Sequence, residues 1–185
     1  LSENLFTELP AVLGQCESLE MIGFKSNQIV TVPSASLPTQ LRWLILTNNK
    51  IESIPASIGK CYRMQKLALA GNQLKELPIE LSNCRNLGLL RISANQLQAF
   101  PEWLLHMPKL SWLAFAGNPF CHKPIIETDL LEVDWNELIL EHELGQGASG
   151  IISRAFWKTQ NQNVAVKVFK GAVTSDGFPE DEMDA

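Results

Sequence analysis

A pattern of apolar residues that recurs every 22 or 23 residues constrains this chain more than any other feature. Five copies, such as "MQKLALAGNQLKELP", share the pattern L-x-x-L-x-L-x-x-N-x-L with apolar substitutes. Their asparagines are Asn27, Asn49, Asn72, Asn95 and Asn118. A period of this length is the signature of a stacked, quasi-linear architecture. Because one copy cannot bury its apolar residues alone, its stability must come from stacking against neighbouring copies.

Each copy predicts two elements. The alternation of apolar residues in its middle predicts a short strand with one buried face. The five strands are expected to be parallel and to be centred on Ile22, Leu44, Leu67, Leu90 and Leu113. After the proline of each copy, segments such as "IELSNCRNL" carry apolar residues at roughly helical spacing, which favours a helical turn.

Residues 1–123 resemble the leucine-rich-repeat family on the strength of these copies. The resemblance implies an α/β fold: a solenoid with parallel strands on the concave side and helical or irregular convex segments. It also implies a structural role for the repeated asparagines, which would bond backbone groups where the chain turns. A partial copy around Asn4 opens the chain, so we expect the protein to extend upstream of Leu1.

Three of the four cysteines share one position of the repeat. Cys16, Cys61 and Cys84 are therefore expected to be small, buried apolar side chains. Cys121 follows the last copy without a closely spaced second cysteine, which favours a reduced thiol over an extracellular cysteine-rich cap. The chain also has no N-x-S/T sequon, and this absence favours an intracellular location.

The outward strand positions predict a surface for a protein partner. The residues expected there are Met21, Trp43, Lys66, Leu89, Arg91 and Trp112. Exposed aromatic residues anchor interfaces, so the two tryptophans point to a contact surface. The alternative, that each tryptophan only packs on its neighbours in the sheet, stays open.

Charge and hydropathy restrict the other partners. Residues 1–123 hold 11 basic and 8 acidic residues, whereas residues 124–185 hold 4 basic and 12 acidic residues. Neither part has a basic face strong enough to predict nucleic-acid binding. Since no apolar run approaches eighteen residues, the sequence predicts no membrane span.

A second feature follows the repeats, in the stretch "ELGQGASGIISRAFWK". Gly145, Gly147 and Gly150 have the spacing G-x-G-x-x-G, and glycine lets backbone N–H groups approach phosphate oxygens closely. The residues after the loop are rich in β-branched and aromatic types, which predicts a strand. The loop therefore joins two strands in a hairpin, unlike the strand-to-helix turn of dinucleotide-binding folds. A third strand, "VAVKVF", contains Lys167.

The segment from about Asp134 to Lys170 resembles the start of a protein kinase domain, and "DWNEL" loosely resembles the tyrosine-kinase-like group. Ser149 departs from the aromatic residue that many kinases have at the loop tip. The resemblance implies a catalytic role for Lys167, which would hold the α and β phosphates of ATP. Glu182, or Glu180, would orient Lys167. The ATP-binding residues would be Gly145, Gln146, Gly147, Ala148, Ser149, Gly150, Ile152, Ala165 and Lys167.

The predicted organisation is leucine-rich repeats over 1–123, an acidic cap or linker over 124–137, and a truncated kinase N-lobe over 138–185. The catalytic-loop residues and the magnesium ligands of a kinase would lie outside this chain. We therefore expect the fragment alone to be inactive, as the first part of a Ser/Thr kinase that uses ATP with Mg²⁺. The alternative is a non-catalytic scaffold or a pseudokinase. Fewer than thirty residues separate Asn118 from Gly145, which leaves no room for a membrane span and predicts a cytoplasmic location.

Overall fold

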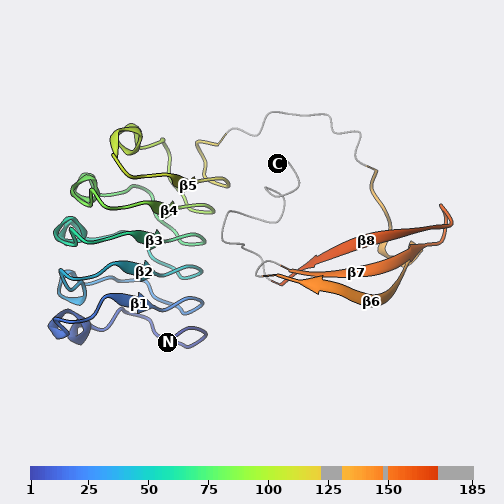
Figure 1. Ribbon diagram of the computed structural model, residues 1–185, viewed down its shortest axis with the longest axis horizontal. Helices are drawn as coiled ribbons and strands as arrows, with labels where there is room; N and C mark the ends of the chain where they lie inside the picture. Colours follow the sequence, from blue (N-terminus) through green and yellow to red (C-terminus); the bar gives the residue numbers. More distant parts are fainter. Residues whose placement is uncertain (122–130, 148–149, 171–185) are drawn as a thin grey trace. The chain divides into compact units, whose positions relative to one another are not determined.

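The computed structural model of the chain describes residues 1–121, 131–147 and 150–170. They divide into two compact units, the first ending at Cys121. The first unit is a stack of repeats with one five-stranded parallel sheet (Figure 1). Its strands, in spatial order, are β1 (Met21–Gly23), β2 (Trp43–Ile45), β3 (Lys66–Ala68), β4 (Leu89–Arg91) and β5 (Trp112–Ala114).

The strand register confirms the predicted strand centres. Ile22 pairs with Leu44, and the same row continues through Leu67, Leu90 and Leu113. The first four of these side chains are buried and the last is partly buried. The sheet therefore places identical repeat positions side by side, which is the stacking that the fixed period predicts.

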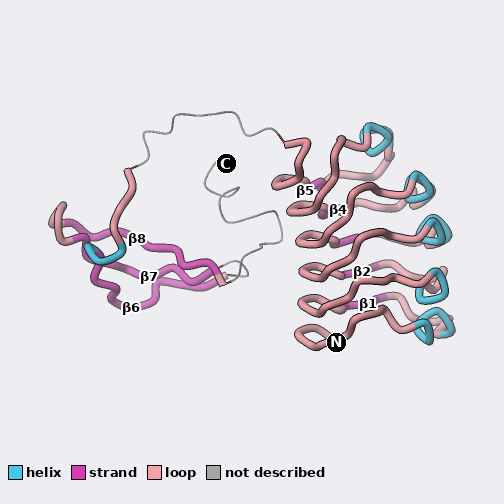
Figure 2. Tube along the Cα trace, turned by 180° about the vertical axis from the view of Figure 1, so that it is seen from behind, coloured by secondary structure: helices cyan, strands magenta, loops and turns pink. Residues whose placement is uncertain are grey.

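Each repeat carries a short helix, and these helices follow one another along one side of the stack (Figure 2, cyan). These are 3₁₀ helices, and the α-helical content implied by an α/β class is absent from the described residues. They are η1 (Ala11–Gln15), η2 (Ser34–Ser36), η3 (Ala56–Lys60), η4 (Ile79–Asn83) and η5 (Glu102–His106). A proline precedes every one of them. A 3₁₀ turn rises about 2.0 Å per residue against 1.5 Å for an α-helix, so it suits the short segment between proline and next strand.

The repeated asparagines close the turns, as Asn72 illustrates. Its Nδ2 donates to the carbonyl oxygens of Leu46 (3.0 Å) and Leu69 (2.9 Å), while its Oδ1 accepts from the backbone N–H of Ile51 at 3.0 Å. One buried side chain thus joins its own repeat to the preceding one. The preceding residue, Gly71, has φ 67°, a left-handed conformation in which glycine has no steric penalty.

The cysteine prediction is correct for two of the three repeats. Cys61 and Cys84 are buried, and burial raises their pKa values to about 11 and about 12. The Cys84 thiol lies 3.3 Å from the carbonyl oxygen of Ile58 in the preceding repeat. Cys16 is exposed, contrary to the prediction, because no described coil precedes the first repeat and covers this position. All four cysteines are free thiols.

The second unit is a three-stranded antiparallel sheet preceded by a 3₁₀ turn, η6 (Trp135–Glu137). Its strands are β6 (Leu138–Gln146), β7 (Gly150–Trp157) and β8 (Gln162–Phe169), in that order. The predicted hairpin around the glycine loop is therefore confirmed. Ala155 is the one fully buried apolar residue among the described positions of this sheet.

Candidate functional site

The first candidate site is the sheet face, defined here by the first and third residues of strands β1–β5. The middle residue of each strand points into the core, so its two neighbours point outward. Met21 is 50% exposed and Trp112 is 53% exposed, while Trp43 and Leu89 are partly buried. Every residue expected to bind a partner therefore lies on this one face.

Two cation–aromatic pairs organise the sheet face. The Nζ of Lys66 lies 4.1 Å from the ring centroid of Trp43, and the Cζ of Arg91 lies 5.7 Å from that of Trp112. Such pairs contribute about 0.5–1 kcal/mol at exposed sites. The rings are thus held in place by their neighbours while part of each remains open to solvent.

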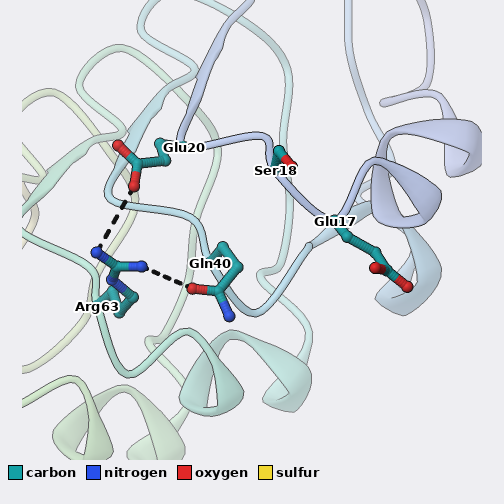
Figure 3. Close-up of a pocket in the computed structure, with 5 residues that line it drawn as sticks. All are labelled: Glu17, Ser18, Glu20, Gln40 and Arg63. Carbon is teal, nitrogen blue, oxygen red and sulfur yellow. Dashed lines mark hydrogen bonds and ion pairs between the residues drawn. The ribbon is translucent and has the colours of Figure 1, made fainter.

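An ionic cluster borders this face at its β1 end, and sequence analysis missed it. Glu20 Oε2 lies 3.2 Å from Nη1 of Arg42, and its Oε1 lies 3.6 Å from Nη2 of Arg63. Figure 3 shows the Arg63 contact and the hydrogen bond from Arg63 to Gln40. A hollow of about 200 Å³ beside the cluster is lined by Glu20, Met21, Arg42 and Trp43. Glu20 and Arg42 occupy one repeat position, immediately before the strand, which is the signal that could have predicted their contact.

The second candidate site is the glycine-loop hairpin. Gly145 pairs with Ile152 across β6 and β7, and Ile152 pairs with Lys167 across β7 and β8. Residues paired directly across antiparallel strands point to the same face of a sheet. Ala165, two residues before Lys167, points to that face as well. The sheet thus places Gly145, Ile152, Ala165 and Lys167 together, and the last three side chains are exposed.

The fold requires glycine at one of the three glycine positions of the loop and not at the other two. A Cβ on Gly150 would lie 2.7 Å from the carbonyl oxygen of Val168, so β8 leaves no space for a side chain there. No described atom lies within 4 Å of a Cβ built on Gly145 or Gly147, and neither has a left-handed φ. The packing and backbone of the described residues therefore do not require glycine at these two positions.

Two lysines lie beside the loop. Lys167 Nζ is 4.5 Å from the ring centroid of Phe169, and its Cε is 3.4 Å from the Cβ position of Gly150. Lys170 Nζ donates to Gln146 Oε1 at 3.0 Å and to the carbonyl oxygen of Gly147 at 3.3 Å. Two lysine side chains therefore border the base of the glycine loop. Ala148, Ser149, Glu180 and Glu182 lie outside the described residues.

Glu137 ties the start of β6 to the far end of β7. Its Oε2 accepts from Thr159 Oγ1 at 2.5 Å and from Trp157 Nε1 at 2.8 Å. These bonds, the first from Thr159, hold the pKa of Glu137 below its usual value. Lys158 Nζ adds a hydrogen bond of 2.8 Å to the carbonyl oxygen of Asn136. The "DWNEL" stretch therefore anchors the hairpin at the end opposite the glycine loop.

Across 1–121, 131–147 and 150–170, no three His, Cys, Asp or Glu side chains come together as metal ligands. None of the helices described there is long and apolar enough to span a bilayer.

Comparisons with known proteins identify the repeats. The family model described as leucine rich repeat matches residues 39–97. A leucine-rich-repeat protein of Leptospira interrogans is 28% identical with a TM-score of 0.58, over 62% of this chain and 30% of that chain. The leucine-rich-repeat ectodomain of the receptor kinase SOBIR1 from Arabidopsis thaliana is 25% identical with a TM-score of 0.54, over 65% of this chain and 70% of that one. No curated protein matches the chain.

The fold of the first unit and these matches define a parallel-stranded repeat solenoid of the protein-interaction type. Residues 39–97 match the leucine-rich-repeat family model, and the first unit is similar to solved leucine-rich-repeat structures. It spans less than a third of the Leptospira protein's length, and the family match ends before the three-stranded sheet begins.

Proposed function

We propose that this chain joins a protein-binding repeat domain to the ATP-binding start of a cytoplasmic protein kinase domain. The repeats supply the protein-interaction module. The three-stranded sheet supplies the glycine loop and Lys167. The Arabidopsis relative is a receptor kinase with leucine-rich repeats, so repeats and a kinase occur together in that protein.

The observation that carries the nucleotide part is the row Gly145–Ile152–Lys167 across the three strands. It presents a glycine, an apolar side chain and an ammonium group on one face. The open space at Gly145 and Gly147 supports the same assignment. Glycine at a position that the fold leaves free suits a backbone that a ligand approaches closely.

The roles proposed for individual residues follow from this arrangement. The backbone from Gln146 to Gly150 covers the phosphates, and Ile152 and Ala165 contact the adenine. Lys167 pairs with the α and β phosphates, and Glu182 orients Lys167. ATP with Mg²⁺ supplies the phosphoryl group, and the metal ligands are expected outside this chain.

A nucleotide-directed label tests this proposal even where affinity is weak. An acyl-phosphate derivative of ATP transfers its acyl group to a lysine that lies beside the bound phosphates. We expect mass spectrometry to find Lys167 acylated in preference to Lys158, an exposed lysine in the turn after β7. Excess ATP with Mg²⁺ should suppress the label on Lys167 alone. Equal labelling of both lysines, insensitive to ATP, would contradict the nucleotide site.

A second candidate function is a non-catalytic scaffold or pseudokinase. The observation that favours it is that the family match and both solved relatives are described as leucine-rich repeats. A scaffold would retain partner binding on the sheet face and would leave Lys167 unlabelled in the same experiment.

A further inference from the structure

We infer that the hollow between the first two repeat strands binds the C-terminal residue of a partner polypeptide, taking its apolar side chain and its free α-carboxylate together. The inference rests on the protein-binding role proposed for the repeats and adds the chemistry of the partner. It starts from one juxtaposition: the hollow of about 200 Å³ has two apolar walls, Met21 and Trp43, and two charged walls, Glu20 and Arg42.

The size and the apolar walls of the hollow suit a single side chain. Sites that enclose a drug-sized ligand have volumes of about 300–1,000 Å³, so this hollow takes a smaller group. Met21 is 50% exposed, and Trp43 is partly buried, with the Nζ of Lys66 lying 4.1 Å from its ring centroid. An apolar partner side chain that covers Met21 removes apolar surface from water, which favours binding.

Charge complementarity selects an anion for the polar part of the ligand. The carboxylate of Glu20 is shared by two guanidinium groups, with Oε2 3.2 Å from Nη1 of Arg42 and Oε1 3.6 Å from Nη2 of Arg63. These three side chains together carry one net positive charge. Glu17 lines a neighbouring hollow, and its side chain points away from Arg63 (Figure 3). Because both oxygens of Glu20 are already paired, the cluster attracts an anion rather than a cation.

Arg42 is held in place and keeps donors for a second carboxylate. Its Nη1 donates to Glu20 at 3.2 Å, and its Nη2 donates to Gln65 Oε1 at 3.1 Å. A guanidinium group has five N–H donors in a fixed plane, so these two bonds leave others for a ligand. Arg63 holds the other oxygen of Glu20, so Glu20 stays paired when Arg42 also contacts a ligand. The side chain of Arg42 is 39% exposed and is therefore accessible.

The spacing of Arg42 and Trp43 favours a chain terminus over an internal acidic residue. The two residues are consecutive, and both line the hollow. At a C-terminal residue the carboxylate and the side chain leave the same Cα, so one residue reaches both walls. In an extended internal segment, two side chains on the same side are two residues apart, or about 6.8 Å, against a rise of about 3.4 Å between consecutive residues. Capture of a C-terminal carboxylate is a recurring mode of peptide recognition.

Titration of the ¹⁵N-labelled chain with a short peptide tests the inference, because nuclear magnetic resonance detects the weak binding expected of a single-residue contact. The probe is acetyl-Gly-Ser-Thr-Leu with a free C-terminal carboxylate. We expect saturable shifts of the Trp43 indole N–H and of the Met21 and Arg42 amides. The same peptide with a C-terminal amide should bind about tenfold more weakly, since hydrogen bonds to charged groups are the stronger class. A C-terminal Ala in place of Leu should also weaken binding, because it covers less apolar surface.

Protein variants assign the carboxylate to Arg42. Arg42→Gln should lower affinity for the free-acid peptide about tenfold and leave the amide peptide unaffected. Glu20→Gln should raise affinity for the free-acid peptide about threefold, because it removes a competing carboxylate at an exposed site. Damage to the fold cannot produce such a gain. The matched control is Arg85→Gln, which removes a positive charge from an exposed position before β4 and should change neither affinity.

Each outcome decides the inference separately from the proposed function. Equal binding of the free-acid and amide peptides, or a loss of affinity in Glu20→Gln, overturns the requirement for a C-terminal carboxylate. An absence of shifts at Trp43, or an effect of Arg85→Gln as large as that of Arg42→Gln, overturns the site. A partner bound elsewhere on the sheet face would shift the amides of β3–β5 instead, so the protein-binding role can hold where the inference fails. Labelling of Lys167 by the ATP probe concerns another unit of the chain and is independent of these results.

Discussion

At the scale of single residues, the repeat unit depends on buried polar side chains that replace missing backbone partners. Asn49, Asn72 and Asn95 each donate to carbonyl oxygens of their own and the preceding repeat. Each also accepts a backbone N–H from the preceding repeat. A buried backbone group without a partner costs free energy of the order of a lost hydrogen bond, so this residue type is specified by the fold.

The variant Asn72→Leu measures this contribution. Leucine fills the space but leaves the groups of Leu46, Leu69 and Ile51 without the bonds that Asn72 makes. We expect the free energy of unfolding to fall by about 1–3 kcal/mol, read from the midpoint of a urea titration. Asn86→Leu is the control and should change the midpoint far less, because the two side-chain bonds of Asn86, to Tyr62 and from Lys109, lie at an exposed position. An unchanged midpoint for Asn72→Leu would contradict the assignment.

Alanine substitutions separate the glycines that the fold requires from those assigned to the ligand. Gly150→Ala should destabilise the three-stranded sheet, because its Cβ would lie 2.7 Å from the carbonyl oxygen of Val168. Gly147→Ala should leave the sheet intact, because no described atom lies near its Cβ, and should reduce labelling of Lys167 by the ATP probe. Hydrogen exchange of the β7 and β8 amides reads the stability of each variant. Equal loss of protection in both would argue against a ligand role for Gly147.

At the scale of elements, the three-stranded sheet is fastened at one end by Glu137 and open at the other, where the glycine loop lies. The register between β6 and β7 shifts twice, between Leu140 and Glu143 and again before Gly145. Trp157 pairs with Leu138, which brings its indole to Glu137. The anchor therefore fixes the start of the hairpin whose other end carries the candidate site.

The hydrogen bonds to Glu137 make the stability of the three-stranded sheet depend on pH. Hydrogen bonds from Thr159 and then Trp157 lower the pKa of Glu137 below its ordinary value, so the charged form is favoured in the folded sheet. When a carboxyl group has a lower pKa in the folded state than in the unfolded state, it stabilises the fold fully at pH values above its unfolded-state pKa. This stabilisation is lost as the pH falls through its folded-state pKa. We expect the indole N–H resonance of Trp157 to shift with a midpoint below the ordinary pKa of a glutamate side chain, and this shift to vanish in Glu137→Gln. A midpoint at or above the ordinary value would contradict the bond.

The sequence predicted the elements better than the contacts between their side chains. The strand centres near Ile22 and Leu67 were predictable because the same apolar columns recur in every repeat. The bond between Glu137 and Trp157 was not, since it depends on a strand register that two irregularities alter. The exposure of Cys16 was missed because a repeat position is buried only where a preceding coil covers it.

In the two candidate sites as well, the positions of residues could be predicted from the sequence and their side-chain contacts could not. The residues of the sheet face could be read from repeat positions, and the row containing Gly145 and Lys167 from the hairpin pattern. The stacking of Lys66 on Trp43 could not be predicted, because a long lysine side chain can turn in either direction from the same sequence position. The position of a residue in the fold follows from the periodicity of the sequence. The residue that its side chain contacts depends instead on side-chain rotamers and strand register.

At the scale of the whole molecule, the described apolar core belongs to the repeats. Its buried cluster runs from Leu9 to Met107, with partly buried residues such as Phe6 and Phe120 packed against it. In stacked repeats each coil is stabilised by its own residues and its immediate neighbours. The stability of the first unit should therefore come almost entirely from residues 1–121.

A shortened chain tests this distribution. Residues 1–121 alone should give the far-ultraviolet circular dichroism expected of the repeats and should melt within about 3 °C of the main transition of the full chain, because a change of 1 kcal/mol shifts the melting temperature by several degrees. Failure of the shortened chain to fold cooperatively would show that later residues contribute to the core.

We propose that one chain carries a protein-binding repeat face and an ATP-binding glycine loop on separate units. Nuclear magnetic resonance of the ¹⁵N-labelled chain, titrated with ATP and Mg²⁺, tests it most directly because it detects weak binding residue by residue. We predict saturable shifts at the amides of Gly145, Gly147 and Gly150 and at β8 around Lys167, with the repeat amides unchanged. No shifts at millimolar ATP, or shifts spread over β1–β5, would contradict it.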